Sequence, residues 1–148
     1  MDNEQAERLE RRWRKFQEVM GYTDEEIAMY RSDPQKVKVM ERAPKFATHI
    51  IIAECVFSRN CNAGHKVGDK IVMDGNGVIL CDLGPERICY GVILSIAPCI
   101  YAIWERFAED LSDVSIMLDK VHCPDVGVEK GGWGETVWRV YAEPKKKD

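Results

Sequence analysis

Thiols and imidazoles are concentrated in two short segments of the sequence. In the first, Cys61 and His65 lie four residues apart, on either side of Gly64. The second, His122-Cys123-Pro124-Asp125, adds a thiol, an imidazole and a carboxylate. Sulfur and imidazole nitrogen are the ligands that zinc and iron take in proteins, and a thiol beside an imidazole can also act as a nucleophile with its base. The sequence therefore raises two chemical hypotheses, a tetrahedral metal site and a reactive Cys61.

The metal hypothesis has a defined ligand set and a plain alternative. Zinc or iron would be held by Cys61, His65 and Cys123, and Cys89 or His122 would complete the shell. A single Cys-x-x-x-His is less specific than paired Cys-x-x-Cys motifs, and a free cysteine often serves only as a small buried residue. No complete catalytic constellation stands beside these residues, so the sequence assigns no catalytic residue.

Whether the two segments meet depends on the uncharged stretch from Ile88 to Trp104. Pro98 lies inside this stretch, and a proline either kinks one helix or separates two. A single kinked helix would return the chain to the far end of a sheet, so that the next strand delivers Cys123 to the same end as Cys61. Two separate helices would leave Cys123 at the opposite edge. One helix is therefore the condition for a shared site.

The glycine-rich segment 127–134 suggests a second kind of site. Its candidate ligand residues are Gly131, Gly132 and Trp133, because backbone amides can form an anion-binding nest and an indole ring can stack on a ligand. The segment matches neither common nucleotide-binding glycine motif. It would act as a lid over a pocket, or it is a wide hairpin loop whose Trp133 packs on the sheet edge.

The first third of the chain predicts helices. Leu9, Trp13, Phe16 and Met20 follow the spacing of one helical stripe, and charged residues surround them. The segment 23–26 reads as a capping box, which starts a short helix that ends near residue 31. Pro34 opens another helix, since proline is tolerated at a helix's first position, and that helix ends before Pro44. Trp13 and Phe16 would form the core of these helices or a stripe that docks on a partner.

The remaining chain predicts strands around a central apolar helix. β-Branched and apolar runs, together with the turn signal Asp74-Gly75-Asn76-Gly77, predict strands over 46–57, 70–73, 78–81, 115–122 and 136–142. The apolar region 84–110 predicts the helix. The fold class expected is α+β, a mainly antiparallel sheet covered by a kinked apolar helix, with a helical N-terminal extension. The expected divisions are the extension at 1–44, the α+β domain at 45–143 and a disordered tail at 144–148.

Composition limits the class of protein. The chain has 148 residues, of which 45% are hydrophobic and 31% charged, and its net charge is −4. These values are typical of a globular domain and exclude a disordered chain, a fibre and a disulfide-dependent miniprotein. The acidic balance argues against a nucleic-acid partner. The charged N-terminus lacks a secretory signal, so we expect six reduced cysteines and a cytoplasmic protein.

The uncharged stretch 88–104 is 17 residues long, the lower limit for a membrane span. It contains a glycine, a proline and two tyrosines, and charged residues flank it closely. A buried helix is therefore expected, and no membrane partner.

Three spaced motifs resemble those of one protein family. They are Cys61-x-x-Gly64-His65-Lys66-x-Gly68-Asp69, then Ile88-Cys89 at the entry to the apolar helix, and Cys123-Pro124-Asp125 before the last strand. In this order they are similar to a family of small bacterial and archaeal proteins without a characterised function, over residues 50–140. The resemblance implies a cytosolic, cysteine-bearing α+β domain linked to a metal, and no established reaction.

Three functions follow from these observations. The first is an accessory or small subunit of a larger cytosolic enzyme system, which docks on a protein partner through the N-terminal helices. The second is a small metal-binding protein or metalloenzyme with the Cys/His site. The third is a small-molecule binding domain closed by the loop that carries Trp133. A protein partner or a second copy of the chain is the expected partner.

Overall fold

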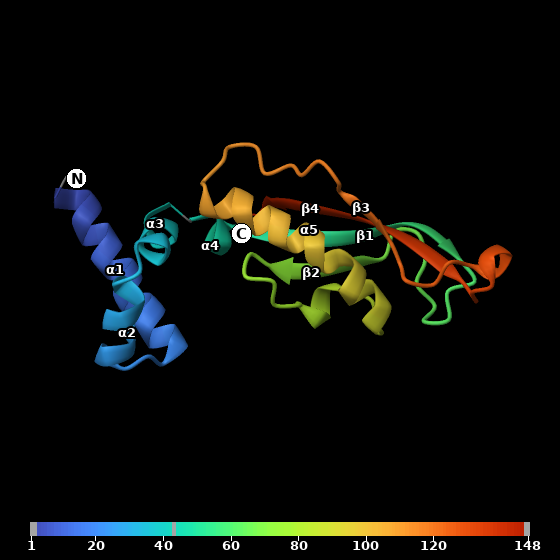
Figure 1. Cartoon of the computed structure of the whole chain (residues 1–148), viewed down its shortest axis with the longest axis horizontal. Coiled ribbons are helices and arrows are strands. Elements are labelled where there is room, and N and C mark those ends of the chain that lie inside the picture. The colour runs from blue at the N-terminus through green and yellow to red at the C-terminus, as the bar shows by residue number, and fades with distance from the viewer. Residues whose placement is uncertain (1–2, 43, 147–148) are drawn as a thin grey trace. The chain divides into compact units, whose positions relative to one another are not determined.

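The computed structural model of the protein describes residues 3–42 and 44–146 (Figure 1). The chain divides into two compact units, Met1–Ala43 and Pro44–Asp148, here named the N-terminal unit and the C-terminal unit. Each is described by itself.

The N-terminal unit consists of the helices α1 (Asn3–Met20), α2 (Asp24–Arg31) and α3 (Pro34–Arg42). The predicted capping box is confirmed at the start of α2. The Thr23 side chain accepts a hydrogen bond from the Glu26 N–H, and the Glu26 carboxylate accepts one from the Thr23 N–H. These bonds satisfy two amides that the first turn of a helix leaves without partners.

The apolar stripe of α1 is used inside the N-terminal unit. Trp13 is buried, and its ring packs edge-on against Phe16 and Tyr30 at centroid distances of 6.3 and 6.0 Å. The Arg31 guanidinium lies 5.2 Å from the Trp13 ring centroid. Met20, at the end of the predicted stripe, is exposed instead. Trp13 is therefore a core residue and does not offer its ring to a partner.

The C-terminal unit is built on a sheet with the strand order β2-β1-β4-β3, in which every neighbouring pair is antiparallel. The strands are β1 (His49–Arg59), β2 (Lys70–Asp74), β3 (Lys120–His122) and β4 (Glu135–Pro144), and a short helix α4 (Lys45–Thr48) precedes β1. The α+β class with a mainly antiparallel sheet is confirmed.

One face of this sheet is covered by helix α5 (Tyr90–Ala108), which is drawn in yellow and orange in Figure 1. Its inward residues form one cluster with the sheet residues that point toward it: Ile51, Ala53, Cys55, Ile71, Met73, Val92, Ile96, Cys99, Ile103, Phe107, Trp138 and Val140. In the described part of the chain, α5 is the one helix whose length and composition would suit a membrane span. The core helix of a globular domain passes the same test.

Helix α5 continues through Pro98, so the segments that carry Cys61 and Cys123 reach the same end of the sheet. Strands β1 and β3 are both antiparallel to β4, which makes their directions equal. Cys61 follows the end of β1 and Cys123 follows the end of β3. The topological condition for a shared site is therefore met.

The structure corrects the predicted return strand at 78–81. Only Ile79 pairs with Met73, and a single 3₁₀ turn, η1 (Cys81–Leu83), follows. The Asp74 carboxylate accepts hydrogen bonds from the Asn76 and Val78 N–H groups. Because these local bonds tie the turn amides to a side chain, fewer amides are left to pair with β2. The ladder of hydrogen bonds between β2 and the predicted return strand is therefore short.

Other element bounds also differ from the predictions. The strand expected from residue 46 begins only at His49, because residues 45–48 form helix α4, and the predicted strand 115–122 is reduced to β3. Two residues of the predicted tail take part in the fold, because Pro144 belongs to β4 and the Lys145 N–H donates to the Thr48 carbonyl. Residues 147 and 148 of that predicted tail lie outside the described residues.

Candidate functional site

A pocket of about 330 Å³ lies at the sheet edge where β1 and β3 end and α5 begins. Three segments that are distant in sequence contribute thiols to its lining, through Cys61, Cys89 and Cys123. The buried imidazole of His65 lines it as well. Four of the five predicted ligand residues therefore surround one space.

His65 is fixed by contacts on every side. His65 is only 4% exposed, and its ring stands edge-on to the Trp138 ring at a centroid distance of 5.1 Å. Its Nε2 atom accepts a hydrogen bond from the backbone N–H of Cys89 at 3.3 Å. Its Nδ1 atom lies 3.6 Å from a carboxylate oxygen of Asp69. Because a backbone amide can only donate, Nε2 is the unprotonated nitrogen and the proton is placed on Nδ1.

Cys89, whose backbone N–H donates to His65, is also the N-cap of α5. Cys89 has extended backbone angles there, and no side-chain hydrogen bond caps the helix. A Cβ atom added at Gly91 would lie 3.6 Å from the Cys89 sulfur and 3.2 Å from the Pro124 ring. Gly91 therefore leaves the room in which the helix start and the Cys123-Pro124 segment approach each other around the pocket.

The sulfur atom of Cys123 makes two hydrogen bonds. Its sulfur accepts one from the Thr136 N–H at 3.2 Å and donates one to the Asp125 carbonyl at 3.4 Å. Thr136 is buried on β4 and also lines the pocket. The position of this thiol is thus set by the main chain around it.

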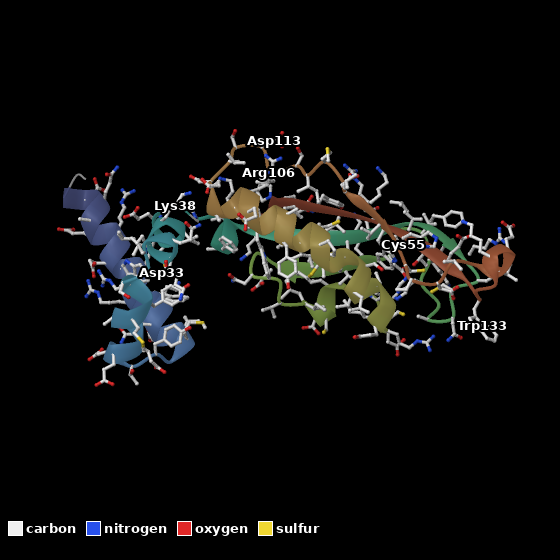
Figure 2. All side chains as sticks on the ribbon, in the orientation of Figure 1. Asp33, Lys38, Cys55, Arg106, Asp113 and Trp133 are labelled. Carbon is white, nitrogen blue, oxygen red and sulfur yellow. The ribbon has the colours of Figure 1, made fainter. Side chains whose placement is uncertain are left out.

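The other cysteines differ from the pocket thiols in their surroundings. Cys55 and Cys99 are buried in the core, and Cys81 is exposed. The pKa of Cys55 is raised to about 11, mainly by burial and in smaller part by the neighbouring Asp69, Cys61 and Cys123. Burial also raises the pKa of Cys99. Figure 2 labels Cys55, which lies on strand β1.

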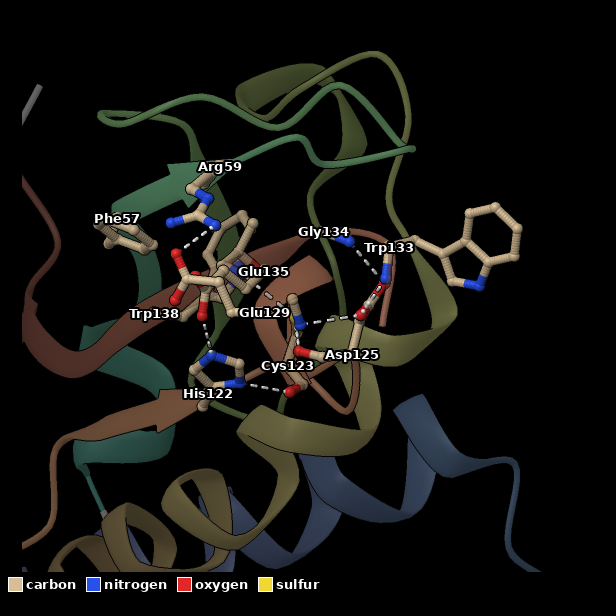
Figure 3. A network of polar contacts seen from close by, with 12 residues as sticks. Phe57, Arg59, His122, Cys123, Asp125, Glu129, Trp133, Gly134, Glu135 and Trp138 are labelled. Carbon is tan, nitrogen blue, oxygen red and sulfur yellow. Dashed lines mark hydrogen bonds and ion pairs between the residues drawn. The ribbon is translucent and has the colours of Figure 1, made fainter. Parts of the chain in front are cut away.

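His122, the fifth predicted ligand, does not line the pocket. Its Nε2 atom lies 3.0 Å from a Glu135 carboxylate oxygen, and its Nδ1 atom lies 2.6 Å from the Cys123 carbonyl oxygen (Figure 3). Both neighbours are acceptors, so a protonated imidazole that donates from both nitrogens fits this position. The hydrogen bond to Glu135 is the largest cause that raises the pKa of His122, and the hydrogen bond to the Cys123 carbonyl is the second.

The glycine-rich segment does not close the pocket. Trp133 is 84% exposed and its indole ring points away from the network around Asp125 (Figure 3). Gly131 and Gly132 are also outside the pocket lining, to which this segment contributes Gly134. Gly131, Gly132 and Trp133 therefore lie outside the pocket in this structure, and a lid formed by them stays a prediction.

The Asp125 carboxylate binds the backbone amides of the glycine-rich segment, where a bound anion was expected. The Asp125 side chain accepts hydrogen bonds from the N–H groups of Gly127, Trp133 and Gly134, at 2.9 to 3.1 Å. These backbone bonds, the one from Gly134 first, lower the pKa of Asp125. A Cβ atom at Gly132 would overlap this carboxylate, which explains the glycine there. Since Asp125 uses these amides, the segment is not an anion nest.

The pocket does not have the geometry of a formed metal centre. Within residues 3–42 and 44–146, no three Cys, His, Asp or Glu side chains are placed as a ligand set. His65 uses its unprotonated nitrogen for the Cys89 amide, so that nitrogen is engaged. Zinc or iron binding stays a prediction, and it would require the thiols to move and this hydrogen bond to break.

Sequence reasoning missed the structural part of the site. It singled out Asp125 only as a further carboxylate, although this residue organises the whole loop. It also missed Gly91 and Thr136, which shape the pocket around the sulfur atoms. The Cys-Pro-Asp order followed by several glycines was the one signal that could have indicated a carboxylate bound to loop amides.

No family model matches the chain, and no match was found among the curated proteins or among the solved structures. The resemblance to a family of small bacterial and archaeal proteins therefore stays an expectation.

Proposed function

We propose that the C-terminal unit is a small-molecule binding domain, whose ligand enters the pocket and contacts Cys61, Cys89 and Cys123. The observation that carries this proposal is the convergence of three thiols and a buried imidazole around one space. A volume of about 330 Å³ is at the lower end of the range for ligand pockets, so the ligand is compact.

The lining suggests the chemistry of that ligand. Ala63, Gly91, Val92 and Pro124 give the pocket apolar walls beside the sulfur atoms. Sulfur is soft and polarisable, and prefers soft partners to hard oxygen-rich ones. A small, largely apolar, thiophilic molecule is therefore the ligand class that we infer.

The first experiment tests whether the thiols of Cys61, Cys89 and Cys123 are reached through the same pocket. Alkylation by iodoacetamide is followed at each cysteine by mass spectrometry, in the wild type and in Ala63→Phe, which places a ring in the pocket. We expect Ala63→Phe to slow the labelling of Cys61, Cys89 and Cys123 by about tenfold or more, because reactivity depends on access.

Two controls belong to this experiment. Exposed Cys81 should react at the same rate in both proteins, and Ala28→Phe, on the exposed surface of α2, should change no rate. Unchanged labelling of all three pocket thiols in Ala63→Phe would contradict a shared pocket.

The second experiment tests whether a small apolar thiol reagent enters the pocket. Monobromobimane, a small apolar thiol reagent, should label a pocket cysteine in the wild type and fail to label it in Ala63→Phe. Elemental analysis of the protein purified without oxygen forms the other arm. Near-stoichiometric zinc or iron, lost in the Cys61→Ser and Cys123→Ser variants, would favour the metalloprotein instead.

Docking on a larger enzyme stays a second candidate function. The observation in its favour is the separate compact N-terminal unit, with exposed Val19, Met20 and Met29 on α1 and α2. If these residues bind a partner, the variant Val19→Glu/Met20→Glu should lose a protein that co-purifies with the wild type from its own host. Equal recovery with both chains would contradict docking through this end of α1.

A further inference from the structure

Gly91 shows how near the Cys89 thiol lies to the main chain of Cys123. A Cβ atom placed at Gly91 would lie 3.6 Å from the Cys89 sulfur and 3.2 Å from Pro124 Cδ. The peptide bond between Cys123 and Pro124 is trans, so Pro124 Cδ stands next to the Cys123 Cα atom, at about 3 Å. The space of one methyl group therefore lies between the Cys89 sulfur and the backbone that carries the Cys123 thiol.

Both thiols are accessible through the same space. Cys89 and Cys123 line the pocket, and each residue is partly exposed. The Cys89 side chain does not cap helix α5, so its rotation breaks no capping bond. The Cys123 sulfur is held only by main-chain groups, the Thr136 N–H and the Asp125 carbonyl. A reagent dissolved in water thus reaches both sulfur atoms without opening the core.

The other cysteines are less suited to pair with Cys123. Cys61 and Cys123 follow β1 and β3, which lie on opposite sides of β4. Two strand spacings amount to about 9–10 Å, and the Cα atoms of a disulfide usually lie within about 7 Å. Cys55 and Cys99 are buried in the core. Cys89 approaches Cys123 from α5, outside the sheet, and does not meet this limit of strand spacing.

We propose that the pocket is an oxidation site, in which a hydroperoxide converts Cys89 and Cys123 into one disulfide. The consequence of this bond rests on the proposed function, because it removes two of the three thiols that the ligand would contact. It also joins the start of α5 to the segment after β3 across the pocket. The reduced pocket binds its ligand, and the oxidised pocket does not.

The oxidation needs one hydroperoxide and proceeds in two steps. The first sulfur attacks a peroxide oxygen, the O–O bond breaks, and a sulfenic acid forms while water or an alcohol leaves. The second sulfur attacks the sulfenic sulfur, the S–S bond forms, the S–O bond breaks, and water leaves with the thiol proton. The two thiols lose two electrons, which the peroxide takes up.

Mass spectrometry of the whole chain tests this bond. A Cys81→Ser background removes the exposed thiol, and hydrogen peroxide is the oxidant. After alkylation and digestion without a reductant, we expect the peptides of Cys89 and Cys123 joined and lighter by two hydrogen atoms. Fragmentation assigns the sulfur atoms, because Cys99 shares a tryptic peptide with Cys89. Cys61→Ser should keep the bond, and Cys89→Ser should lose it.

Gly91→Ala tests the geometry with both thiols present. Alanine is favoured over glycine in a helix, so this variant should fold. Its methyl group fills the space between the Cys89 sulfur and Pro124. We therefore expect the disulfide to form about tenfold more slowly, because a disulfide tolerates little departure from its geometry. Leu94→Ala, on the exposed side of α5, should form it at the wild-type rate.

Labelling of Cys61 by monobromobimane measures the effect of the bond on the pocket. We expect labelling to slow by about tenfold in the oxidised protein, because reactivity depends on access. Dithiothreitol should restore the original rate once it has reduced the disulfide and has been removed. The same measurement on Cys61 in the reduced Cys89→Ser/Cys123→Ser variant should show no slowing, since that variant forms no cross-link.

Four results would overturn the proposal. They are the absence of a linked pair after peroxide treatment, a main disulfide that contains Cys61, a Gly91→Ala variant that oxidises at the wild-type rate, and a disulfide that leaves Cys61 labelling unchanged. Failure of the proposed function gives a different pattern. In that case the disulfide forms in the wild type, and Ala63→Phe does not alter the labelling of the reduced pocket thiols.

Discussion

The Nε2 atom of His65 accepts a hydrogen bond from the backbone N–H of Cys89 at 3.3 Å. This bond joins the loop after β1 to the first residue before α5, across 24 positions of the chain. The loop is also fixed internally, because the Asp69 carboxylate accepts from the Lys66 N–H and the His65 carbonyl accepts from the Ser58 hydroxyl. His65 therefore acts first as a structural link between two walls of the pocket.

Removal of the His65 ring should destabilise the protein. His65→Ala leaves the Cys89 amide without its acceptor and opens a cavity beside Trp138, so we expect a loss of about 2–4 kcal/mol. Urea unfolding followed by tryptophan fluorescence measures it. Lys66→Ala, the exposed neighbour, should stay within about 0.5 kcal/mol of the wild type. A loss below about 0.5 kcal/mol for His65→Ala would refute the structural role.

The ion pair between His122 and Glu135 predicts a pH dependence of stability. The pKa of His122 is raised in the folded state, so its contribution is fully present below the unfolded pKa. The contribution is lost as the pH rises through the folded pKa. The side chain is 41% exposed, so solvent screening limits the effect to about 1 kcal/mol at most.

Thermal unfolding from pH 5.5 to 8.5, about the titration range of histidine, measures this contribution. The Tm of the wild type should exceed that of His122→Gln at the acidic end, and the difference should shrink at the alkaline end. A constant difference across the whole range would show that the charge of His122 is not involved.

Gly134 should not tolerate a side chain. A Cβ atom there would overlap the backbone oxygen of Asn60, where the chain leaves β1. Backbone cannot move aside as a flexible side chain can, so Gly134→Ala should cost about 2–4 kcal/mol. Gly131 has a left-handed φ of +84° and open space around it, so Gly131→Ala should cost only about 1 kcal/mol. Urea unfolding of both variants should show this order, and the reverse order would contradict it.

Asp125 should control the order of the loop that follows it. Asp125→Ala removes the acceptor for three backbone amides, so hydrogen exchange at Gly127, Trp133 and Gly134 should speed up by about tenfold or more. The pKa of Asp125 is lowered in the fold, so its contribution is present above the unfolded pKa and is lost as the pH falls through the folded pKa. Exchange in the N-terminal unit serves as the internal control. Unchanged exchange at all three amides would contradict this role.

Local sequence signals predicted most elements because those elements depend on neighbouring residues. The capping box at Thr23 and Glu26 formed as expected, since both bonds lie within one turn. The return strand at 78–81 failed because the sequence could not show that the Asp74 side chain captures the turn amides. Local hydrogen bonds of this kind compete with a strand ladder, and composition does not reveal which wins.

The three pocket cysteines and His65 were predictable from the sequence, and the geometry of the site was not. One continuous α5 and two strands of equal direction were enough to bring Cys61 and Cys123 to one edge. Nothing local distinguishes His122 from His65, although one lies outside the pocket and the other is buried in its wall. Strand β3 ends at His122, and its pairing with β4 aims the ring at Glu135. The direction of the His122 ring depends on the register between β3 and β4, which local sequence patterns do not reveal.

The two core cysteines give the folded state its own kinetic reporter. Each donates its S–H to a backbone carbonyl, Cys55 to Phe57 and Cys99 to Leu118, and burial suppresses the thiolate of both. Reagents in water reach these sulfur atoms only when the sheet and α5 separate. Under conditions where chemistry outpaces closing, their modification rate thus equals the rate at which the core opens, without any label added to the protein.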